Sequence, residues 1–428
     1  MVTVQQLKTL IASEGLRSSV LMIFGNVFAQ GMSGVSIILL SRFIGPEEFG
    51  LFSTGFSVAL IFASVIDLGL SAAQQHLIPR ASTNEERNTI FATAMFLKLV
   101  LFGITALLVL AFAPFLHERL QFSSSQVIVL IVLANIGSVF FNQLGGILLS
   151  IKRVAQTVVI NSLQAMSKLI LAALVFGLGW RSGETILFIY LMLPLVVLPF
   201  VRQLLPEWFR LSVRFDLASW LRMRSMALNN WVASFGAVLI QNADIVLVSM
   251  YLSQQEAGLM GAASRLAMFI ALIGGSLSAV LNPRVSTYQS GADISAYWRK
   301  ALVLLAGSSL LALISFFASG PLISLTVGDE YQSASQVLGW LLAASWLGVG
   351  LAPISALFYS YDKPWYFSIS AGIQALILVA GTALLLPQYG IIAAGWVRLS
   401  AQLVIIIFTL FLALQSHRKK YNALPRLI

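Results

Sequence analysis

The chain alternates long apolar runs with short polar breaks over almost its whole length, and this pattern limits the folds open to it. A helix needs about 20 mostly apolar residues to cross the roughly 30 Å of hydrocarbon in a bilayer. Only 10% of the 428 residues are charged, against about 25% in an average soluble domain. We therefore predict an all-α polytopic membrane protein with twelve transmembrane helices. The predicted spans are approximately 18–43, 51–70, 88–114, 125–150, 155–178, 184–204, 226–250, 257–278, 298–320, 333–359, 365–386 and 391–414.

An internal repeat predicts how these helices are grouped. Residues 125–153 align without a gap with residues 335–363, from an opening Ser-Gln-Val to a closing basic residue. Residues 41–50 match residues 249–258 at almost the same spacing and share a Ser, a Glu and a Gly. Each repeat holds six helices, an even number, so both face the same way across the membrane. We predict two pseudo-symmetric six-helix lobes around a central cavity.

The repeat also sets the expected domain boundaries. These are an N-terminal lobe at 1–204, a cytoplasmic linker at 205–225, a C-terminal lobe at 226–414 and a basic cytoplasmic tail at 415–428. Trp, Phe and Leu alternate with Arg along 206–226, which is typical of an amphipathic helix lying at the membrane surface.

The basic residues predict the orientation of the chain. Of the 26 Lys and Arg residues, nineteen fall in segments on one side of the predicted membrane, three on the other and four within helices. By the positive-inside rule, this bias puts both termini in the cytoplasm. The net charge of +10 is then a topology signal and a contact for anionic lipids, and we expect no nucleic-acid partner.

Most enzyme classes lack the residues they need in this chain. It has no cysteine, and its three histidines lie far apart near helix ends. It shows neither a phosphate-binding glycine loop nor a metal-ligand spacing. We expect no catalytic site, metal or cofactor, and energy for any transport would come from an ion gradient or from the fate of the substrate.

One long stretch resembles a known family. The segment SRFIGPEEFGLFSTGFSVALIFASVIDLGLSAAQQHLIPR, at 41–80, is similar to the first hairpin of bacterial polysaccharide and O-antigen flippases. These belong to the multidrug, oligosaccharidyl-lipid and polysaccharide exporter superfamily. GDEYQSASQVL at 328–338 and PQYGIIAAGWVRLSAQL at 387–403 are similar to later segments of the same family. The resemblance implies a flippase of the bacterial inner membrane. Its substrate would be a polyprenyl-pyrophosphate-linked oligosaccharide for lipopolysaccharide or another surface glycan, supplied to a polysaccharide polymerase.

Ionisable residues inside the spans are the first candidates for a substrate site, because each costs roughly 2.5–3.5 kcal/mol near the bilayer centre. Lys168 and Arg265 are the preferred ligands for an anion, with Lys98 and Arg398 second. The alternative for each is snorkelling or a structural ion pair. Asp67, near a helix end, is expected to tie that end rather than bind substrate.

Polar residues at helical spacing extend the candidate site. Asn161 and Gln164 share a helix face with Lys168, a stripe that lipid would not tolerate. Asn26 in the first helix and Gln241 in the seventh lie on similar polar stripes, and Asp244 continues the second. Asp244 is a candidate counter-ion for Arg265 or a site for a coupling H⁺ or Na⁺.

The balance of intramembrane charge favours an anionic substrate. Four cations (Lys98, Lys168, Arg265 and Arg398) face only two carboxylates (Asp67 and Asp244) within the spans. Excess positive charge suits a lipid pyrophosphate that enters by alternating access. A cation-coupled multidrug exporter of the same fold is the alternative and should have an acidic cavity. A membrane scaffold, glycosyltransferase or polymerase is a further alternative, and an enzyme of that kind should have a large outer loop.

Overall fold

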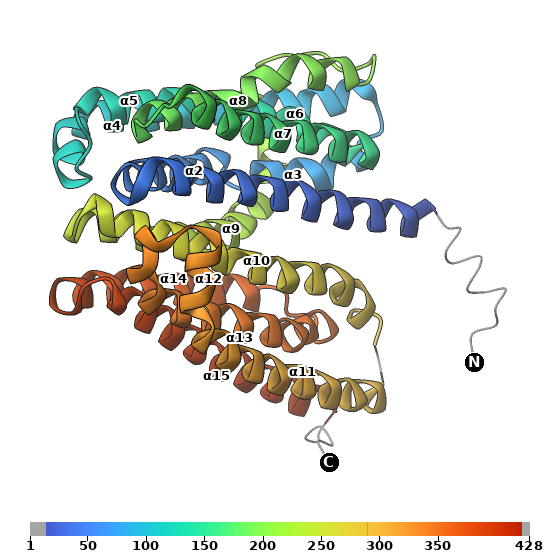
Figure 1. The fold of residues 1–428 in the computed structure, drawn as a ribbon. Coiled ribbons are helices and arrows are strands. Elements are labelled where there is room, and N and C mark those ends of the chain that lie inside the picture. Colours follow the sequence, from blue (N-terminus) through green and yellow to red (C-terminus); the bar gives the residue numbers. More distant parts are fainter. Residues whose placement is uncertain (1–13, 289, 422–428) are drawn as a thin grey trace.

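A computed structural model describes residues 14–288 and 290–421, and all regular structure in these residues is helical (Figure 1). By length and composition, eleven helical stretches in these ranges could cross a membrane. The first, Phe24–Asp67, is 44 residues long and covers most of the first two predicted spans. The prediction of a twelve-helix membrane protein is therefore confirmed.

The N-terminal lobe forms the upper half of Figure 1 and the C-terminal lobe the lower half. The upper lobe contains α2 (Glu14–Asp67), α3 (Leu70–Leu77), η1 (Ile78–Arg80), α4 (Asn84–Arg119), α5 (Ser125–Ala134), α6 (Ile136–Ser150), α7 (Val154–Leu178) and α8 (Gly183–Leu204). The lower lobe contains α9 (Leu217–Tyr251), α10 (Gln254–Val285), α11 (Gly291–Phe317), α12 (Ser319–Thr326), η2 (Asp329–Ala334), α13 (Ser335–Ser360), α14 (Tyr366–Tyr389) and α15 (Ile392–Tyr421).

The turn inside α2 follows from two adjacent residues. Gly45 has φ 80° and ψ 168°, a backbone conformation that an L side chain rarely adopts. Pro46 comes next and suits the first turn of a new helix, where its missing N–H would have no partner. The glycine ends the first span and the proline starts the second, as a helical hairpin requires.

Backbone geometry reproduces the sequence repeat. Lys152 and Asp362, which are 210 residues apart, both have positive φ, at 62° and 57°. Each follows a helix that ends with the same bond pattern. The amide of Arg153 donates to the Leu148 carbonyl over 2.8 Å, and that of Lys363 to the Phe358 carbonyl over 2.9 Å. The two lobes therefore share local geometry at corresponding places, as pseudo-symmetry predicts.

The linker between the lobes differs from the prediction of an amphipathic surface helix. Residues 206–216 form no helix, and α9 begins at Leu217 and continues into the membrane span. Hydrogen bonds to α4 take the place of helical bonds. The Asn88 side chain donates to the Trp208 carbonyl over 2.9 Å and accepts from the Arg210 amide over 3.0 Å. Because these backbone N–H and C=O groups already have hydrogen-bond partners on α4, the segment does not need helical hydrogen bonds to satisfy them.

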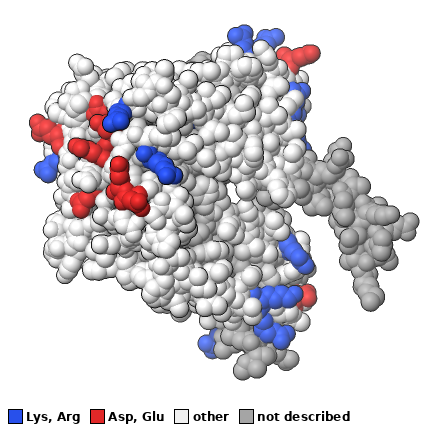
Figure 2. Space-filling view, viewed as in Figure 1, with Lys and Arg blue, Asp and Glu red and all other residues white. Residues whose placement is uncertain are grey.

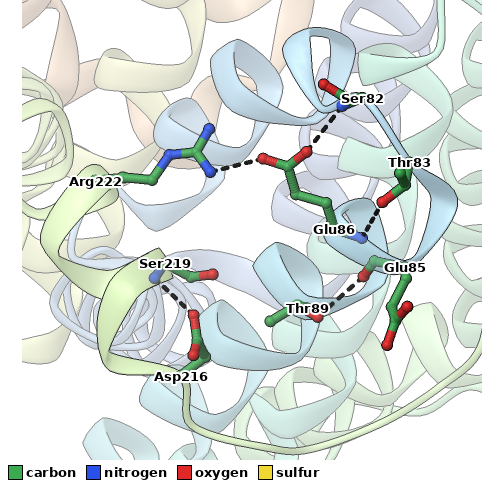
Figure 3. Close-up of polar contacts among 8 residues, drawn as sticks. All are labelled: Ser82, Thr83, Glu85, Glu86, Thr89, Asp216, Ser219 and Arg222. Atoms are coloured by element: carbon green, nitrogen blue, oxygen red, sulfur yellow. Dashed lines mark hydrogen bonds and ion pairs between the residues drawn. The ribbon is translucent and has the colours of Figure 1, made fainter.

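Two helix N-caps and one ion pair stabilise the connection between the lobes (Figure 3). Thr83 caps α4 by accepting from the Glu86 amide, and Glu86 in return accepts from the Ser82 amide over 2.8 Å. The Asp216 carboxylate caps α9 by accepting from the Ser219 amide over 2.7 Å. Hydrogen bonds from the Ser219 side chain and then from its amide hold the pKa of Asp216 below its ordinary value. Arg222 on α9 donates to Glu86 over 2.6 Å. The first turns of α9 are thereby tied to the N-terminal lobe.

Candidate functional site

A cavity of about 310 Å³ lies where the two lobes meet. Its walls come from both halves of α2, from α7 and α8 in the N-terminal lobe, and from α9 and α10 in the C-terminal lobe. Six of the eight predicted substrate-binding residues line it. They are Asn26, Asn161, Gln164, Lys168, Gln241 and Arg265.

The two cations of this cavity come from opposite lobes and share an aromatic cluster. The Lys168 ammonium lies 4.9 Å from the centre of the Tyr190 ring, and the Arg265 guanidinium lies 5.1 Å from that of Phe56. The two rings pack edge to face with centres 5.2 Å apart. Cation–π contact offsets part of the cost of holding a charge away from water. The aromatic pair therefore holds both cations at the cavity wall without neutralising them.

Neither cation has a carboxylate partner in the described part of the chain. The ion pairs found there do not include Lys168 or Arg265, and no Asp or Glu lines the cavity. Arg265 is only 8% exposed, and its Nη2 has no hydrogen-bond acceptor. A buried guanidinium with a free donor is costly unless something else binds it, so the site is suited to an anion.

The other two predicted cations are paired and lie outside this cavity. The Lys98 ammonium is buried, 2.7 Å from the Asp67 carboxylate, and it also donates to the Ser71 hydroxyl. Asp67 thus ties a helix end, as expected, and its partner is Lys98. Arg398 donates to Asp244, which is completely buried. Both pairs match the structural alternative given for these cations.

Asp244 forms its direct ion pair with the Arg398 guanidinium, which reaches from α15 to α9, and not with the candidate partner Arg265. The Asp244 charge still interacts with Arg265 electrostatically, without a direct contact. Asp244 and Arg398 are 154 positions apart, and helical periodicity cannot show which helices become neighbours. Asp67 and Asp244 are paired with Lys98 and Arg398. The two excess positive charges expected from the sequence are therefore those of Lys168 and Arg265.

Polar side chains complete the wall on the N-terminal side. The Asn161 amide donates to the Asn26 carbonyl oxygen over 3.4 Å, which links α7 to α2. Sequence reasoning missed Gln30 and Tyr190, which also line the cavity. Gln30 lies four residues after Asn26, so the same helical spacing could have found it. Tyr190 gave no such signal, because one aromatic residue in an apolar helix resembles core packing.

Close contacts between the lobes seal one end of the cavity. A Cβ atom placed on Gly258 of α10 would lie 1.8 Å from the Pro46 carbonyl oxygen of α2, so the backbones nearly touch. In the same region the Tyr331 hydroxyl donates to the Ser41 carbonyl over 2.7 Å, and the Gln121 amide donates to the Leu252 carbonyl over 3.1 Å.

Toward the opposite end the lobes diverge. Figure 2 shows a notch between them that opens on the end where Lys and Arg gather, whereas Asp and Glu gather at the sealed end. Gln30 and Gln241, which line the cavity, are both exposed. The cavity is thus reached from the basic end and closed at the acidic end.

Comparisons with known proteins agree with this architecture. Residues 16–289 match the family model described as polysaccharide biosynthesis protein. One relative is a probable low-salt glycan biosynthesis flippase, Agl15, from Haloferax volcanii. It is 21% identical over 387 residues, which cover 89% of this chain and 79% of that protein.

Two solved structures share the fold. The lipid II flippase MurJ in an inward closed conformation has a TM-score of 0.71 at 15% identity, covering 94% of this chain and 90% of that one. An inward-facing MATE multidrug resistance transporter of the MOP superfamily has a TM-score of 0.71 at 13% identity, covering 92% of this chain and 96% of that one. At such low identity the likeness shows the fold alone.

Proposed function

Since the chain belongs to the polysaccharide biosynthesis protein family, we propose that it moves a polyprenyl-pyrophosphate-linked oligosaccharide from the inner to the outer leaflet of its membrane. The relative named as a glycan biosynthesis flippase supports this substrate class. The glycan would then serve cell-surface polysaccharide synthesis, such as O-antigen assembly in a bacterial inner membrane, and a polysaccharide polymerase is the expected partner.

The observation that carries the proposal is the pair of unneutralised cations in the cavity. Lys168 and Arg265 line the cavity from the two lobes, with no carboxylate among the lining residues. A pyrophosphate offers oxygen acceptors that an ammonium and a guanidinium can bind together. An organic cation in the same place would meet two like charges, which argues against a multidrug exporter of cations.

Alternating access supplies the transport step. The basic end faces the cytoplasm by the positive-inside rule, so the open notch admits the pyrophosphate and sugar from the inner leaflet. The polyprenyl tail stays in the hydrocarbon, where the outer faces of the helices are apolar. Opening the contacts at Pro46 and Gly258 and closing the cytoplasmic notch would release the head group on the other side.

Asp244 is the proposed point of ion coupling. It is buried and paired with Arg398 on a different helix of the same lobe. An H⁺ or Na⁺ that bound Asp244 would compete with Arg398 and weaken the ion pair that links α9 to α15.

Transport by purified protein in vesicles tests this function. A fluorescent polyprenyl-pyrophosphate oligosaccharide placed in the inner leaflet should reach the outer leaflet faster than in protein-free vesicles, as detected by a membrane-impermeant quencher. The same vesicles loaded with a cationic dye should show no dye export. Dye export without movement of the lipid would refute the proposal and favour the multidrug exporter.

A further inference from the structure

A second cavity, of about 370 Å³, lies inside the C-terminal lobe. Its walls come from α9, α10, α13, α14 and α15, so the N-terminal lobe contributes nothing to it. Gly274, Gly275 and Gly348 are among its lining residues, and their missing side chains leave the space open. The cavity is large enough for a group of several non-hydrogen atoms beyond bound water.

The charge of this second cavity is balanced, unlike that of the first. Arg398 is the charged residue that lines it, and its guanidinium is paired with Asp244. The Arg398 Nε remains buried without a hydrogen-bond acceptor. Because the one charged lining residue is paired, the site carries no net charge, which suits a neutral polar ligand rather than an anion.

Two glutamines add a matched donor and acceptor. The Gln374 amide nitrogen donates to the Gln402 carbonyl oxygen over 2.8 Å. Each side chain keeps its other polar atom free of protein partners in the described part of the chain, namely the Gln402 amide nitrogen and the Gln374 carbonyl oxygen. Phe367 lines the same cavity with an aromatic ring. A sugar presents hydroxyl groups, which amide side chains can bind, and C–H groups, on which an aromatic ring can pack. The second cavity offers both kinds of contact.

Gln241 connects the two cavities, because it lines both of them. One ligand with a charged end and a neutral polar end could therefore occupy both cavities at once. We propose that the second cavity binds neutral sugar residues of the lipid-linked glycan while the pyrophosphate lies between Lys168 and Arg265. This inference rests on the proposed function and adds where the two parts of the substrate are bound.

Binding measured with two forms of one lipid tests the inference. The probes are lipid-linked oligosaccharide extracted from the organism that encodes the protein and polyprenyl pyrophosphate without sugar, each measured by native mass spectrometry in detergent. The wild-type protein should bind the glycosylated lipid more tightly. Gln402→Leu or Gln374→Leu should weaken binding of the glycosylated lipid roughly 3- to 10-fold, the range for one neutral hydrogen bond, and leave the sugar-free lipid unchanged. Gln255→Leu, at an exposed glutamine in the first turn of α10, is the matched control.

Each outcome bears on a different claim. Equal affinity of the two lipids for the wild-type protein, or variants at Gln374 and Gln402 that retain full discrimination, would overturn the sugar site. Such a result would leave the pyrophosphate site intact. Failure of the wild-type protein to bind either lipid would instead refute the proposed function and this inference together. Arg265→Gln should weaken both lipids by the same factor, which separates the two cavities.

Discussion

Replacing Arg265 by glutamine tests whether the first cavity binds an anion. The substitution removes the charge and keeps a shorter, neutral amide at a position that is 8% exposed. A hydrogen bond to a charged group contributes about 1.5–3 kcal/mol, so losing one from guanidinium to phosphate should weaken binding roughly 10- to 150-fold. Lys168→Met should have an effect in the same range, because that ammonium also has no carboxylate partner among the described residues.

The same substitution should not weaken the fold. The Arg265 Nη2 is buried without a hydrogen-bond acceptor, so neutralising the side chain relieves a desolvation cost, which offsets the lost cation–π contact with Phe56. The change breaks no direct ion pair within the described residues. Thermal unfolding of Arg265→Gln in detergent should therefore occur at or above the wild-type temperature, while affinity for polyprenyl pyrophosphate falls. Arg181→Gln makes the same chemical change at an exposed position before α8 and is the control. An Arg265→Gln protein that unfolds earlier but binds normally would refute the reasoning, because it would show a structural role.

Three further predictions concern the ion pair, the seal and the orientation. Lys98→Met should destabilise the protein by about 1–3 kcal/mol, because it leaves the Asp67 carboxylate without its cation. Denaturant titration measures this change, and unchanged stability would contradict the Lys98–Asp67 ion pair. Gly258→Ala places a Cβ 1.8 Å from a carbonyl oxygen, so spin-label distances between the lobes at the acidic end should lengthen. Gly103→Ala, at a position with open space around it, is the control and should leave these distances unchanged. Equal distances in both variants would contradict a tight seal. The chain has no cysteine, so a single engineered Cys can report on which side of the membrane a residue lies. A Cys at position 255 should react with an impermeant thiol reagent in intact cells, and a Cys at position 153 should react only after the cells are permeabilised. The reverse pattern would contradict the predicted topology.

Hydropathy and the repeat were enough to predict the architecture. Each run of apolar residues has to satisfy its own backbone groups in lipid, so a helix was the only solution for every span. The positive φ at both Lys152 and Asp362 agrees with the repeat that the sequence indicated. The linker could not be predicted in the same way, because its backbone bonds go to Asn88 of a helix far away in the sequence.

Helical spacing identified residues that share a face but not the neighbours of that face. Asn161, Gln164 and Lys168 were grouped by their spacing, and they do line one cavity. The partners of Asp244 and Lys98 depend on how helices pack against each other, which one sequence does not reveal. The charge count predicted an excess of two cations, and only the packing shows that Lys168 and Arg265 are the unpaired ones.

The position of the bound pyrophosphate shows whether Lys168 and Arg265 bind the substrate. A cryo-EM map of the protein with polyprenyl-pyrophosphate-linked oligosaccharide can locate the two phosphorus atoms as the strongest ligand density. We expect phosphate oxygens within about 4 Å of both the Lys168 ammonium and the Arg265 guanidinium, the range of an ion pair. Pyrophosphate density bound elsewhere, with both cations free, would contradict this expectation.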